Sequence, residues 1–551
     1  MTNKKKLNGI LERATALAVA RRWAEAAKVY AEAIALGATD YSTHYNYGTV
    51  LLHCGLFEEG RDQMRAALRY NPSSLEALNN LAASSLKLGN AGATEKASRR
   101  IVAIDPRHHV AWTNLGMALC DQGKVEEGLV HLRKALALAP GYQIARESLL
   151  LALNHLATDG AAHLAEHLSR CAVFTPVARK PLPDTRGRRI RLGYVSSDFR
   201  NHSVAFFMKA VIGSHDREAF EVTCYSSTHA PDLVTRQFAG TAEHFVDIAT
   251  MADSEFAKQV EADGIDILVD LGGHTSGNRL GAFALRPAPV QVNYLGYPST
   301  TGCAFIDYRL VDEITDPSES DAYASETLIR LPAPFLCYDP IHPFPALTPP
   351  PLLASGSITF GSFNNSSKIS PATVKLWSLA LKAVPGSRLF VKARAFSDAE
   401  VCESFRQRFI AQGIDGSRLT FSGLISDPIE HLAAYARLDI ALDTFPYNGT
   451  TTTCEALWMG VPVVSLTGQL HAARVGKSLL TAVGLTHLAC ASEDAFVAAV
   501  QALAGDPAEL GILRQRLRGT MTRSPLCDRK RLLEALEQAY RSMLFLEGTR
   551  P

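Results

Sequence analysis

The chain has little that would tie it to metal ions, disulfide bonds or membranes. Its ten cysteines form no C-x-x-C pair, so their spacing indicates neither a zinc site nor a disulfide framework. No apolar run approaches the roughly 18 residues of a membrane-spanning helix. Lys and Arg number 56 against 55 Asp and Glu, so bulk charge favours neither nucleic acid nor an anionic membrane as a partner. We therefore expect a soluble, cytoplasmic protein without a metal site.

The front third of the chain instead has a clear internal repeat of 34 residues. Three kinds of position recur at this step: Arg21, Gly55, Gly89 and Gly123; Pro72, Pro106 and Pro140; and Asn46, Asn80 and Asn114. A period of 34 is that of the tetratricopeptide repeat, a helix pair that hides its apolar face only by stacking on its neighbours. We predict an all-α tetratricopeptide solenoid over residues 8–174, with a groove that holds a protein partner.

The rest of the chain alternates short β-rich runs with helical stretches, which is typical of parallel sheets covered on both faces. Two proline-rich segments divide it into lobes. We predict a linker at 175–188, a first lobe at 189–341, a second linker at 342–357 and a second lobe at 358–546 that ends in a helix. The expected strands lie at residues 190–195, 220–225, 265–271, 290–295, 308–311, 327–331, 358–363, 389–392, 419–422, 440–445 and 461–466.

The most informative segment is residues 448–458, Asn-Gly-Thr-Thr-Thr-Thr-Cys-Glu-Ala-Leu-Trp. It follows a predicted strand and opens a predicted helix, where free N–H groups and the positive end of the helix dipole favour a phosphate. A plain N-cap would need one threonine rather than four, although a threonine-rich cap remains the alternative. Glu455, one turn into the helix, is placed to accept hydrogen bonds from a ribose.

Other polar residues follow predicted strands, where open α/β sheets bind their ligands. Asp198 and His202 follow the first strand, where the histidine could serve as a general base or hold a sugar hydroxyl; the alternative is a capping Asp with a surface His. His274 follows a glycine pair that either approaches a ligand or makes a tight turn. Gly296 and Tyr297 belong to another glycine-bracketed loop.

Lys368 follows the first strand of the second lobe and could neutralise a diphosphate, although most lysines are solvated. His431 is either a helix-surface residue or one that stacks on a base, and His471 and Arg474 could form a second positive pole. No D-x-D triplet occurs, so an anionic leaving group would be held by Lys368, hydroxyls and a helix end rather than by a metal.

Several of these segments together resemble one known family. They are residues 193–202, 284–289, 295–298, 360–365 and 442–455, and they are similar to the tetratricopeptide-repeat protein O-glycosyltransferases, the O-GlcNAc transferase/SPINDLY family. Residues 524–528 and 540–543 are similar to its SPINDLY branch. The resemblance implies a glycosyltransferase-B fold of two Rossmann-like lobes. It also implies an inverting transfer from a nucleotide sugar to a protein Ser or Thr.

The resemblance also implies roles for single residues. His202 faces the junction of sugar and acceptor, and the proton acceptor is either His202 or Asp198. Thr450 stands where animal O-GlcNAc transferases carry a histidine, as in the SPINDLY type. The remaining implied contacts are Lys368 with the diphosphate, Asn365 with the diphosphate or sugar, Thr451 and Thr452 with the phosphates, Glu455 with the ribose and His431 with the nucleobase.

Three alternatives remain open at this point. UDP-GlcNAc is the favoured donor, but the resemblance to SPINDLY also allows an O-fucosyltransferase that uses GDP-fucose. A repeat scaffold without catalysis is the alternative from another class, and a sugar-nucleotide epimerase would share the two-lobed fold but has little use for a repeat array. The acceptor protein and any homo-oligomer are not determined by the sequence.

Overall fold

The computed structural model describes residues 2–156 and 159–545. Residues 157–158, inside the predicted solenoid, and residue 546, the predicted end of the second lobe, lie outside the described residues. The chain forms two compact units that meet in sequence between Arg146 and Glu147, with the short segments 393–405 and 422–424 belonging to the first unit.

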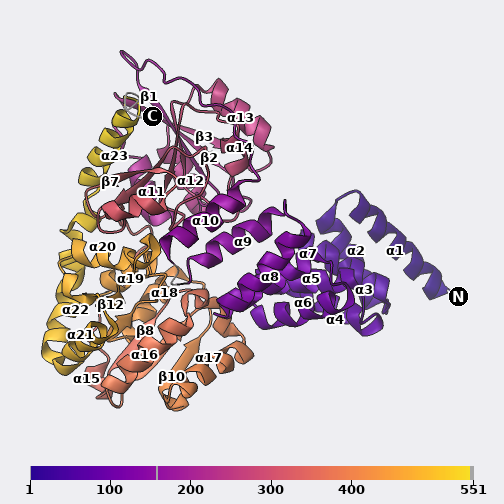
Figure 1. Ribbon diagram of the computed structural model, residues 1–551. Helices are drawn as coiled ribbons and strands as arrows, with labels where there is room; N and C mark the ends of the chain where they lie inside the picture. The colour runs from indigo at the N-terminus through magenta and orange to yellow at the C-terminus, as the bar shows by residue number, and fades with distance from the viewer. Residues whose placement is uncertain (1, 157–158, 546–551) are drawn as a thin grey trace. The chain divides into compact units, whose positions relative to one another are not determined.

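The first unit is an array of antiparallel helix pairs (Figure 1). Equivalent helices begin 34 residues apart, as the starts of α3, α5 and α7 at Tyr41, Leu75 and His109 show. The predicted repeat period is therefore the period of the folded helices. The helices are α1 (Thr2–Val19), α2 (Trp23–Ala35), α3 (Tyr41–His53), α4 (Phe57–Tyr70), α5 (Leu75–Lys87), α6 (Ala91–Ile104), α7 (His109–Asp121) and α8 (Val125–Leu138), followed by α9 (Gln143–Leu153), which continues into the second unit.

Glycines explain how the paired helices turn and pack. Gly55, Gly89 and Gly123 end the first helix of successive pairs with φ of 77°, 75° and 69°, a left-handed conformation that glycine adopts without strain. A β-carbon on Gly116 of α7 would lie 2.8 Å from the carbonyl oxygen of Gly128 in α8, so these two helices need glycine to approach this closely. The repeat thus depends on backbone geometry as well as on apolar burial.

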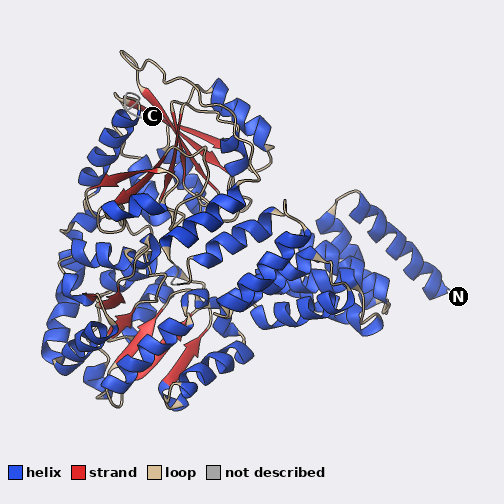
Figure 2. Cartoon of the chain, viewed as in Figure 1, coloured by secondary structure: helices blue, strands red, loops and turns tan. Residues whose placement is uncertain are grey.

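The second unit begins with α10 (Gly160–Cys171) and then contains two parallel sheets flanked by helices (Figure 2). The first sheet has the order β3-β2-β1-β4-β5-β6-β7, and all of its strand pairs run parallel. Its strands are β1 (Ile190–Ser196), β2 (Phe220–Ser226), β3 (His244–Asp247), β4 (Ile267–Asp270), β5 (Val290–Tyr294), β6 (Tyr308–Asp312) and β7 (Thr327–Leu331); its helices are α11 (Ala205–Ile212), α12 (Leu233–Thr241), α13 (Asp253–Ala262) and α14 (Leu280–Ala284).

The second sheet has the order β10-β9-β8-β11-β12-β13. Its strands are β8 (Thr359–Ser362), β9 (Arg388–Lys392), β10 (Leu419–Ser422), β11 (Ile440–Leu442), β12 (Val463–Leu466) and β13 (Ala489–Cys490). Its helices are α15 (Leu352–Ser355), α16 (Pro371–Ala383), α17 (Ala399–Ala411), α18 (Pro428–Ala433), α19 (Thr451–Trp458), α20 (Val475–Ala482), α21 (Glu493–Gly505) and α22 (Pro507–Thr522). The predicted fold class, a helical repeat array followed by two Rossmann-like lobes, is confirmed.

The last helix, α23 (Arg529–Met543), returns from the second lobe to the first. Its Tyr540 hydroxyl lies 3.1 Å from the Tyr194 hydroxyl of β1, and the Glu537 carboxylate accepts a hydrogen bond from the His215 ring at 3.0 Å. The two lobes are therefore joined by this helix as well as by the proline-rich linker. Among the described residues no single helix is long and apolar enough to cross a membrane; the bent pair α21 and α22 passes that test by length and composition only.

Candidate functional site

In each sheet the order of the strands reverses once. The reversal lies between β1 and β4 in the first lobe and between β8 and β11 in the second. Open parallel sheets bind ligands at the carboxyl ends of the strands beside such a point. A cavity of about 400 Å³ lies there, and its lining residues come from both lobes. They are Leu151, His202, Ser203, Val204, Phe207, Thr275, Leu295, Gly296, Pro298, Phe335, Asn364, Asn365, Lys368, Tyr447, Thr450, Thr451, Thr452, His471 and Val475.

The threonine elbow, residues 448–452, forms one wall of this cavity. Thr450 is the N-cap residue of α19, yet its side chain makes no capping hydrogen bond, and Thr450, Thr451 and Thr452 all line the cavity. The Thr452 hydroxyl donates to the Asn364 side chain at 2.9 Å, which fixes its direction. The start of α19 therefore leaves its backbone N–H groups and the hydroxyls of Thr450 and Thr451 available to a ligand. This favours an anion-binding site over a simple helix cap.

Lys368 stands at the same cavity and is held in place without a direct ion pair. Its ammonium donates to the Asn448 carbonyl oxygen at 2.8 Å and lies 3.6 Å from the centre of the Tyr447 ring. Burial lowers the pKa of Lys368, and the negative charge of Asp443 opposes this shift. An ammonium that is desolvated and held by neutral groups gains most from a doubly charged ligand such as a diphosphate.

His202 and Asp198 lie together at the end of β1. The Nδ1 atom of His202 is 3.5 Å from a carboxylate oxygen of Asp198 and 3.4 Å from the backbone nitrogen of Val204. Burial lowers the pKa of His202, while the Asp198 charge raises it. His202 lines the cavity, so its Nε2 atom is the ring nitrogen left for a substrate; Asp198 is buried behind it.

Glu455 and His431 form a hydrogen-bonded cluster, and neither residue lines the cavity. The Glu455 carboxylate lies 3.0 Å from the His431 Nε2 atom and accepts a hydrogen bond from the Tyr435 hydroxyl at 3.0 Å. The Lys392 ammonium lies 2.6 Å from His431 Nδ1, and burial lowers the pKa of Lys392 to about 8. The cluster fixes the orientation of the imidazole that was predicted to meet a nucleobase.

The other predicted residues are distributed unevenly around the cavity. Gly296, His471 and Asn365 line it, and a β-carbon on Gly296 would lie 1.9 Å from the Leu271 carbonyl oxygen, so close packing alone requires this glycine. His471 is hydrogen-bonded to Asp316 of the first lobe. Arg474 donates to the Ile314 carbonyl oxygen at 2.7 Å and is not among the lining residues.

His274 and Tyr297 are also not among the lining residues. Each is 1 % exposed, and each is hydrogen-bonded to buried groups of the second unit. The His274 Nε2 atom lies 2.7 Å from the Thr301 carbonyl oxygen, and the Tyr297 hydroxyl donates to the Leu150 carbonyl oxygen at 2.9 Å. The structure thus separates these two side chains from the cavity that is lined by His202, Lys368 and the threonine elbow.

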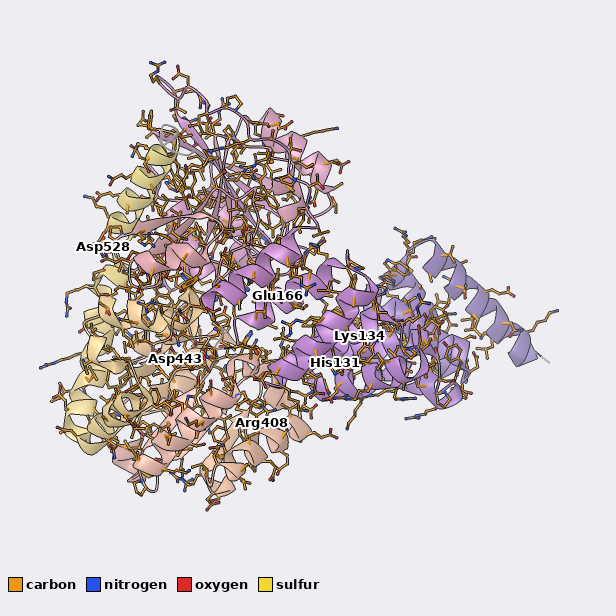
Figure 3. All side chains as sticks on the ribbon, viewed as in Figure 1. His131, Lys134, Glu166, Arg408, Asp443 and Asp528 are labelled. Carbon is orange, nitrogen blue, oxygen red and sulfur yellow. The ribbon has the colours of Figure 1, made fainter. Side chains whose placement is uncertain are left out.

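Two residues that support the site were not singled out from the sequence. Asp443, labelled in Figure 3, accepts hydrogen bonds from the backbone N–H of Gly449 at 2.7 Å and from the Ser465 hydroxyl at 2.7 Å, and so holds the start of the elbow. Tyr447 supplies the ring under Lys368. Tyr447 comes two residues after the predicted strand at 440–445, so the strand-end rule that found the threonines could have found it. Asp443 lies inside that predicted strand, and the structure shows that β11 ends at Leu442, directly before it.

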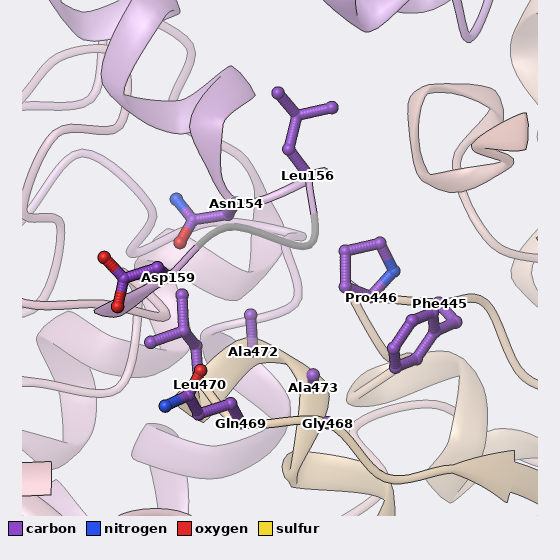
Figure 4. Close-up of a pocket in the computed structure, with 10 residues that line it drawn as sticks. All are labelled: Asn154, Leu156, Asp159, Phe445, Pro446, Gly468, Gln469, Leu470, Ala472 and Ala473. Carbon is purple, nitrogen blue, oxygen red and sulfur yellow. The ribbon is translucent and has the colours of Figure 1, made fainter. Parts of the chain in front are cut away.

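A second cavity, of about 310 Å³, lies beside the 445–446 and 468–473 segments (Figure 4). Its lining is mostly apolar or backbone, and among the described residues that line it Asp159 alone has a charged side chain. It has neither the lysine nor the hydroxyl cluster of the 400 Å³ cavity. We therefore assign the chemistry to the larger cavity.

Two Rossmann-like lobes whose strand ends face one cavity form the architecture of the two-lobed glycosyltransferases. The model of the family described as "Glycosyl transferase family 41" matches residues 148–354 and 350–536. The chain belongs to glycosyl transferase family 41.

The chain is also similar to individual family members. It is 41 % identical over 424 residues to a rice (Oryza sativa subsp. japonica) protein named probable UDP-N-acetylglucosamine–peptide N-acetylglucosaminyltransferase SPINDLY. The aligned region covers 74 % of this chain and 45 % of that protein. A SPINDLY protein of the same name from Arabidopsis thaliana is 44 % identical over 364 residues, 65 % of this chain and 39 % of that one. The chain thus spans less than half the length of these curated relatives.

A solved structure matches over nearly the whole length. It is a mutant of the O-GlcNAc transferase of Thermobaculum terrenum, 34 % identical, with a TM-score of 0.85 and coverage of 92 % of this chain and 97 % of that one. This likeness confirms the predicted combination of tetratricopeptide repeats with a glycosyltransferase-B fold, and the family resemblance predicted from the sequence is confirmed with it.

Proposed function

We propose that this protein is an inverting protein O-glycosyltransferase that moves a sugar, GlcNAc from UDP-GlcNAc, onto a Ser or Thr hydroxyl of a partner protein. Family membership implies a nucleotide-sugar donor. Relatives named as UDP-N-acetylglucosamine–peptide N-acetylglucosaminyltransferases and a solved O-GlcNAc transferase favour this donor. GDP-fucose is the alternative donor.

In this proposal the diphosphate binds to Lys368 and to the start of α19. The single observation that carries the proposal is their convergence on one cavity, with the helix start free of a side-chain cap. Backbone N–H groups of the elbow, the hydroxyls of Thr450 and Thr451 and the Lys368 ammonium would stabilise the charge that develops on the leaving diphosphate. These groups can do this without a divalent metal in the cavity.

The transfer itself forms one bond and breaks one. The acceptor hydroxyl oxygen bonds to the anomeric carbon, the bond from that carbon to the diphosphate oxygen breaks, and the configuration at carbon inverts. The hydroxyl proton goes to a base, for which we propose His202, because it lines the cavity while Asp198 lies behind it. Asn365 would contact the diphosphate or sugar, Glu455 the ribose and His431 the nucleobase.

The repeat array would supply the acceptor. Solenoids of stacked helix pairs present extended concave surfaces that suit peptide and protein partners. The ten cysteines suit a reducing compartment, so we place the activity in the cytoplasm.

Lys368→Ala tests the proposal. We expect sugar transfer from UDP-GlcNAc to fall by at least about a hundredfold, since removing one donor that stabilises developing charge typically costs that much. Lys375→Ala, which removes an exposed lysine of α16 paired with Glu493, is the matched control and should keep full activity.

Three results would contradict the proposal. Retained turnover in Lys368→Ala, with an unchanged melting temperature, would remove Lys368 from the mechanism. No thermal shift of the wild-type protein with UDP-GlcNAc or GDP-fucose would favour a scaffold without catalysis, because a ligand that binds only the native state must raise the melting temperature. A shift with GDP-fucose alone would replace the proposed donor.

A further inference from the structure

One group of soft donor atoms lies where α10 packs on the first lobe, and none of its residues lines the 400 Å³ cavity. Among residues 2–156 and 159–545, the side chains of Cys171, His274 and Cys303 are brought together with their donor atoms all within 4.8 Å of one another. Cys171 ends α10, His274 follows β4, and Cys303 lies in the loop between β5 and β6. All three are buried, at 6 %, 1 % and 0 % exposed.

The carbonyl oxygen of Thr301 completes the group to four. It lies 3.1 Å from Cys171 Sγ, 2.7 Å from His274 Nε2 and 3.6 Å from Cys303 Sγ. Cys171 Sγ is 3.6 Å from His274 Nε2 and 3.1 Å from Cys303 Sγ. Zinc–sulfur and zinc–nitrogen bonds of about 2.3 and 2.0 Å place tetrahedral ligands roughly 3.3–3.8 Å apart. Five of the six separations in the group are thus 2.7–3.6 Å, close to these values, and the sixth, between Cys303 Sγ and His274 Nε2, is within 4.8 Å.

The loop that carries two of these donors is fixed before any ligand binds. Glu326 accepts hydrogen bonds from the Thr301 backbone N–H at 2.6 Å and from the Thr300 hydroxyl at 2.7 Å. Gly302 has a φ of 68°, and a β-carbon there would lie 2.5 Å from the His167 backbone carbon in α10. Close packing against α10 and the Glu326 carboxylate thus hold Thr301 and Cys303 in position, as a preorganised metal site requires.

The neighbouring histidines of α10 support the group rather than join it. His163 Nε2 lies 2.8 Å from the Ser299 hydroxyl, and His167 Nε2 lies 2.7 Å from the Tyr297 hydroxyl. These contacts tie α10 to the part of the loop that precedes Thr301 and Cys303. The donors left facing one another are two thiols, one imidazole and one carbonyl.

We propose that Cys171, Cys303 and His274, with the Thr301 carbonyl oxygen, bind a structural zinc ion. Two thiolates and a divalent cation sum to zero charge, which suits a site without solvent. Thiolate and imidazole ligands select a soft ion such as Zn²⁺ over Mg²⁺ or Ca²⁺. The thiol protons leave to solvent as the metal binds. The ion pins α10 to the β4 and β5–β6 loops and takes no part in the transfer step.

Metal analysis of the full-length protein tests this site. We expect on the order of one zinc per chain in wild-type protein and none above background in Cys303→Ser, together with a lower melting temperature for the variant. Cys224→Ser is the matched control, because Cys224 is also 0 % exposed and lies on β2 of the same sheet. It should keep its zinc.

A measurement on wild-type protein keeps the test decisive should Cys303→Ser fail to fold. Chelator-treated wild-type protein titrated with Co²⁺ should develop thiolate-to-cobalt absorption in the near ultraviolet that saturates near one equivalent. No zinc uptake and no cobalt spectrum would overturn the proposal. So would full zinc content in Cys303→Ser, or a Cys171–Cys303 disulfide in the peptide map of freshly isolated protein.

Discussion

Lys368 shows at the scale of one residue how burial prepares a charge for its ligand. Its neighbours are a carbonyl, an aromatic ring and the more distant Asp443 carboxylate, and burial lowers its pKa towards the physiological range. A diphosphate at this position would restore the preference for the charged form. Binding and protonation are therefore linked at this side chain.

This linkage predicts that the protein takes up protons at Lys368 when it binds UDP at alkaline pH. Part of the Lys368 population is neutral in the free protein there, and the diphosphate raises its pKa. Affinity for UDP should accordingly fall as the pH rises through 8 to 9. Calorimetry in two buffers of different ionisation enthalpy measures the uptake, and Lys368→Arg, which stays charged, should abolish it. Identical heats in both buffers for the wild type would contradict the linkage.

Asp198 and His202 allow a second prediction at this scale. The Asp198 charge raises the pKa of His202 against the effect of burial, so Asp198→Asn should lower that pKa further. If His202 accepts the proton, the acidic limb of the kcat/KM profile lies below pH 6.5, the ordinary pKa of histidine, and moves to still lower pH in the variant. A variant inactive at every pH would instead make Asp198 the base.

At the scale of elements, the turn between paired helices shows most clearly how backbone conformation affects stability. Gly55, Gly89 and Gly123 occupy its left-handed position, and the first pair has Arg21 there with a φ of 57°. A non-glycine residue in this conformation destabilises the folded state by roughly 1–2 kcal/mol. Glycine avoids this strain, although its greater freedom in the unfolded chain offsets part of the gain. The first repeat thus carries strain that the later repeats lack.

Arg21→Gly should therefore stabilise the first helix pair by about 1 kcal/mol, and Gly55→Ala should destabilise the second pair by a similar amount. Trp23, whose ring stacks on His53 at 4.2 Å, provides a local fluorescence signal for urea unfolding. A lower urea midpoint for Arg21→Gly than for the wild type would show that the arginine side chain contributes more than the backbone strain removes.

The sequence predicted elements well where a local pattern was long or repeated. The 34-residue period and the strands before the threonines are such cases. It missed β3 and β13, because β3 is a half-exposed run of four residues with histidine and aspartate at its ends, and β13 has only two residues. Neither is long or apolar enough to differ from a loop.

The site residues likewise include some that the sequence placed correctly and some that it could not place. The elbow, Lys368 and His202 were found from their place after a strand, and they meet in one cavity. His274 and Tyr297 follow strands too, yet their side chains turn inward, and only tertiary contacts decide that direction. The Cys171, His274 and Cys303 group could not be predicted from spacing, since its members lie 103 and 132 residues from Cys171.

At the scale of the whole molecule, buried neutral histidines link the parts of the second unit. His155 lies 3.2 Å from the Ser367 hydroxyl of the second lobe, and His163 binds Ser299 of the first lobe. Burial lowers the pKa of each to about 4. Since the unfolded chain has ordinary histidines, it binds more protons than the folded chain between about pH 6.5 and 4.

The folded state should therefore lose stability as the pH falls below 6.5, at up to about 1.4 kcal/mol per pH unit for each of these histidines. Melting temperatures measured from pH 7.5 to 5 test this. His163→Asn keeps a hydrogen-bonding group beside Ser299 without titrating, so its curve should be shallower than that of the wild type. Equal slopes for the two proteins would show that the pKa of His163 is the same in the folded and unfolded chain, which would contradict the prediction.

A crystal structure of the wild-type protein with UDP, grown with EDTA in the solution, tests the central claim most directly. The account predicts that the diphosphate oxygens lie within hydrogen-bonding distance of the Lys368 ammonium and of the backbone nitrogens at the start of α19, beside Thr450, Thr451 and Thr452. UDP bound elsewhere, or a diphosphate that leaves the threonine elbow without contact, would contradict it.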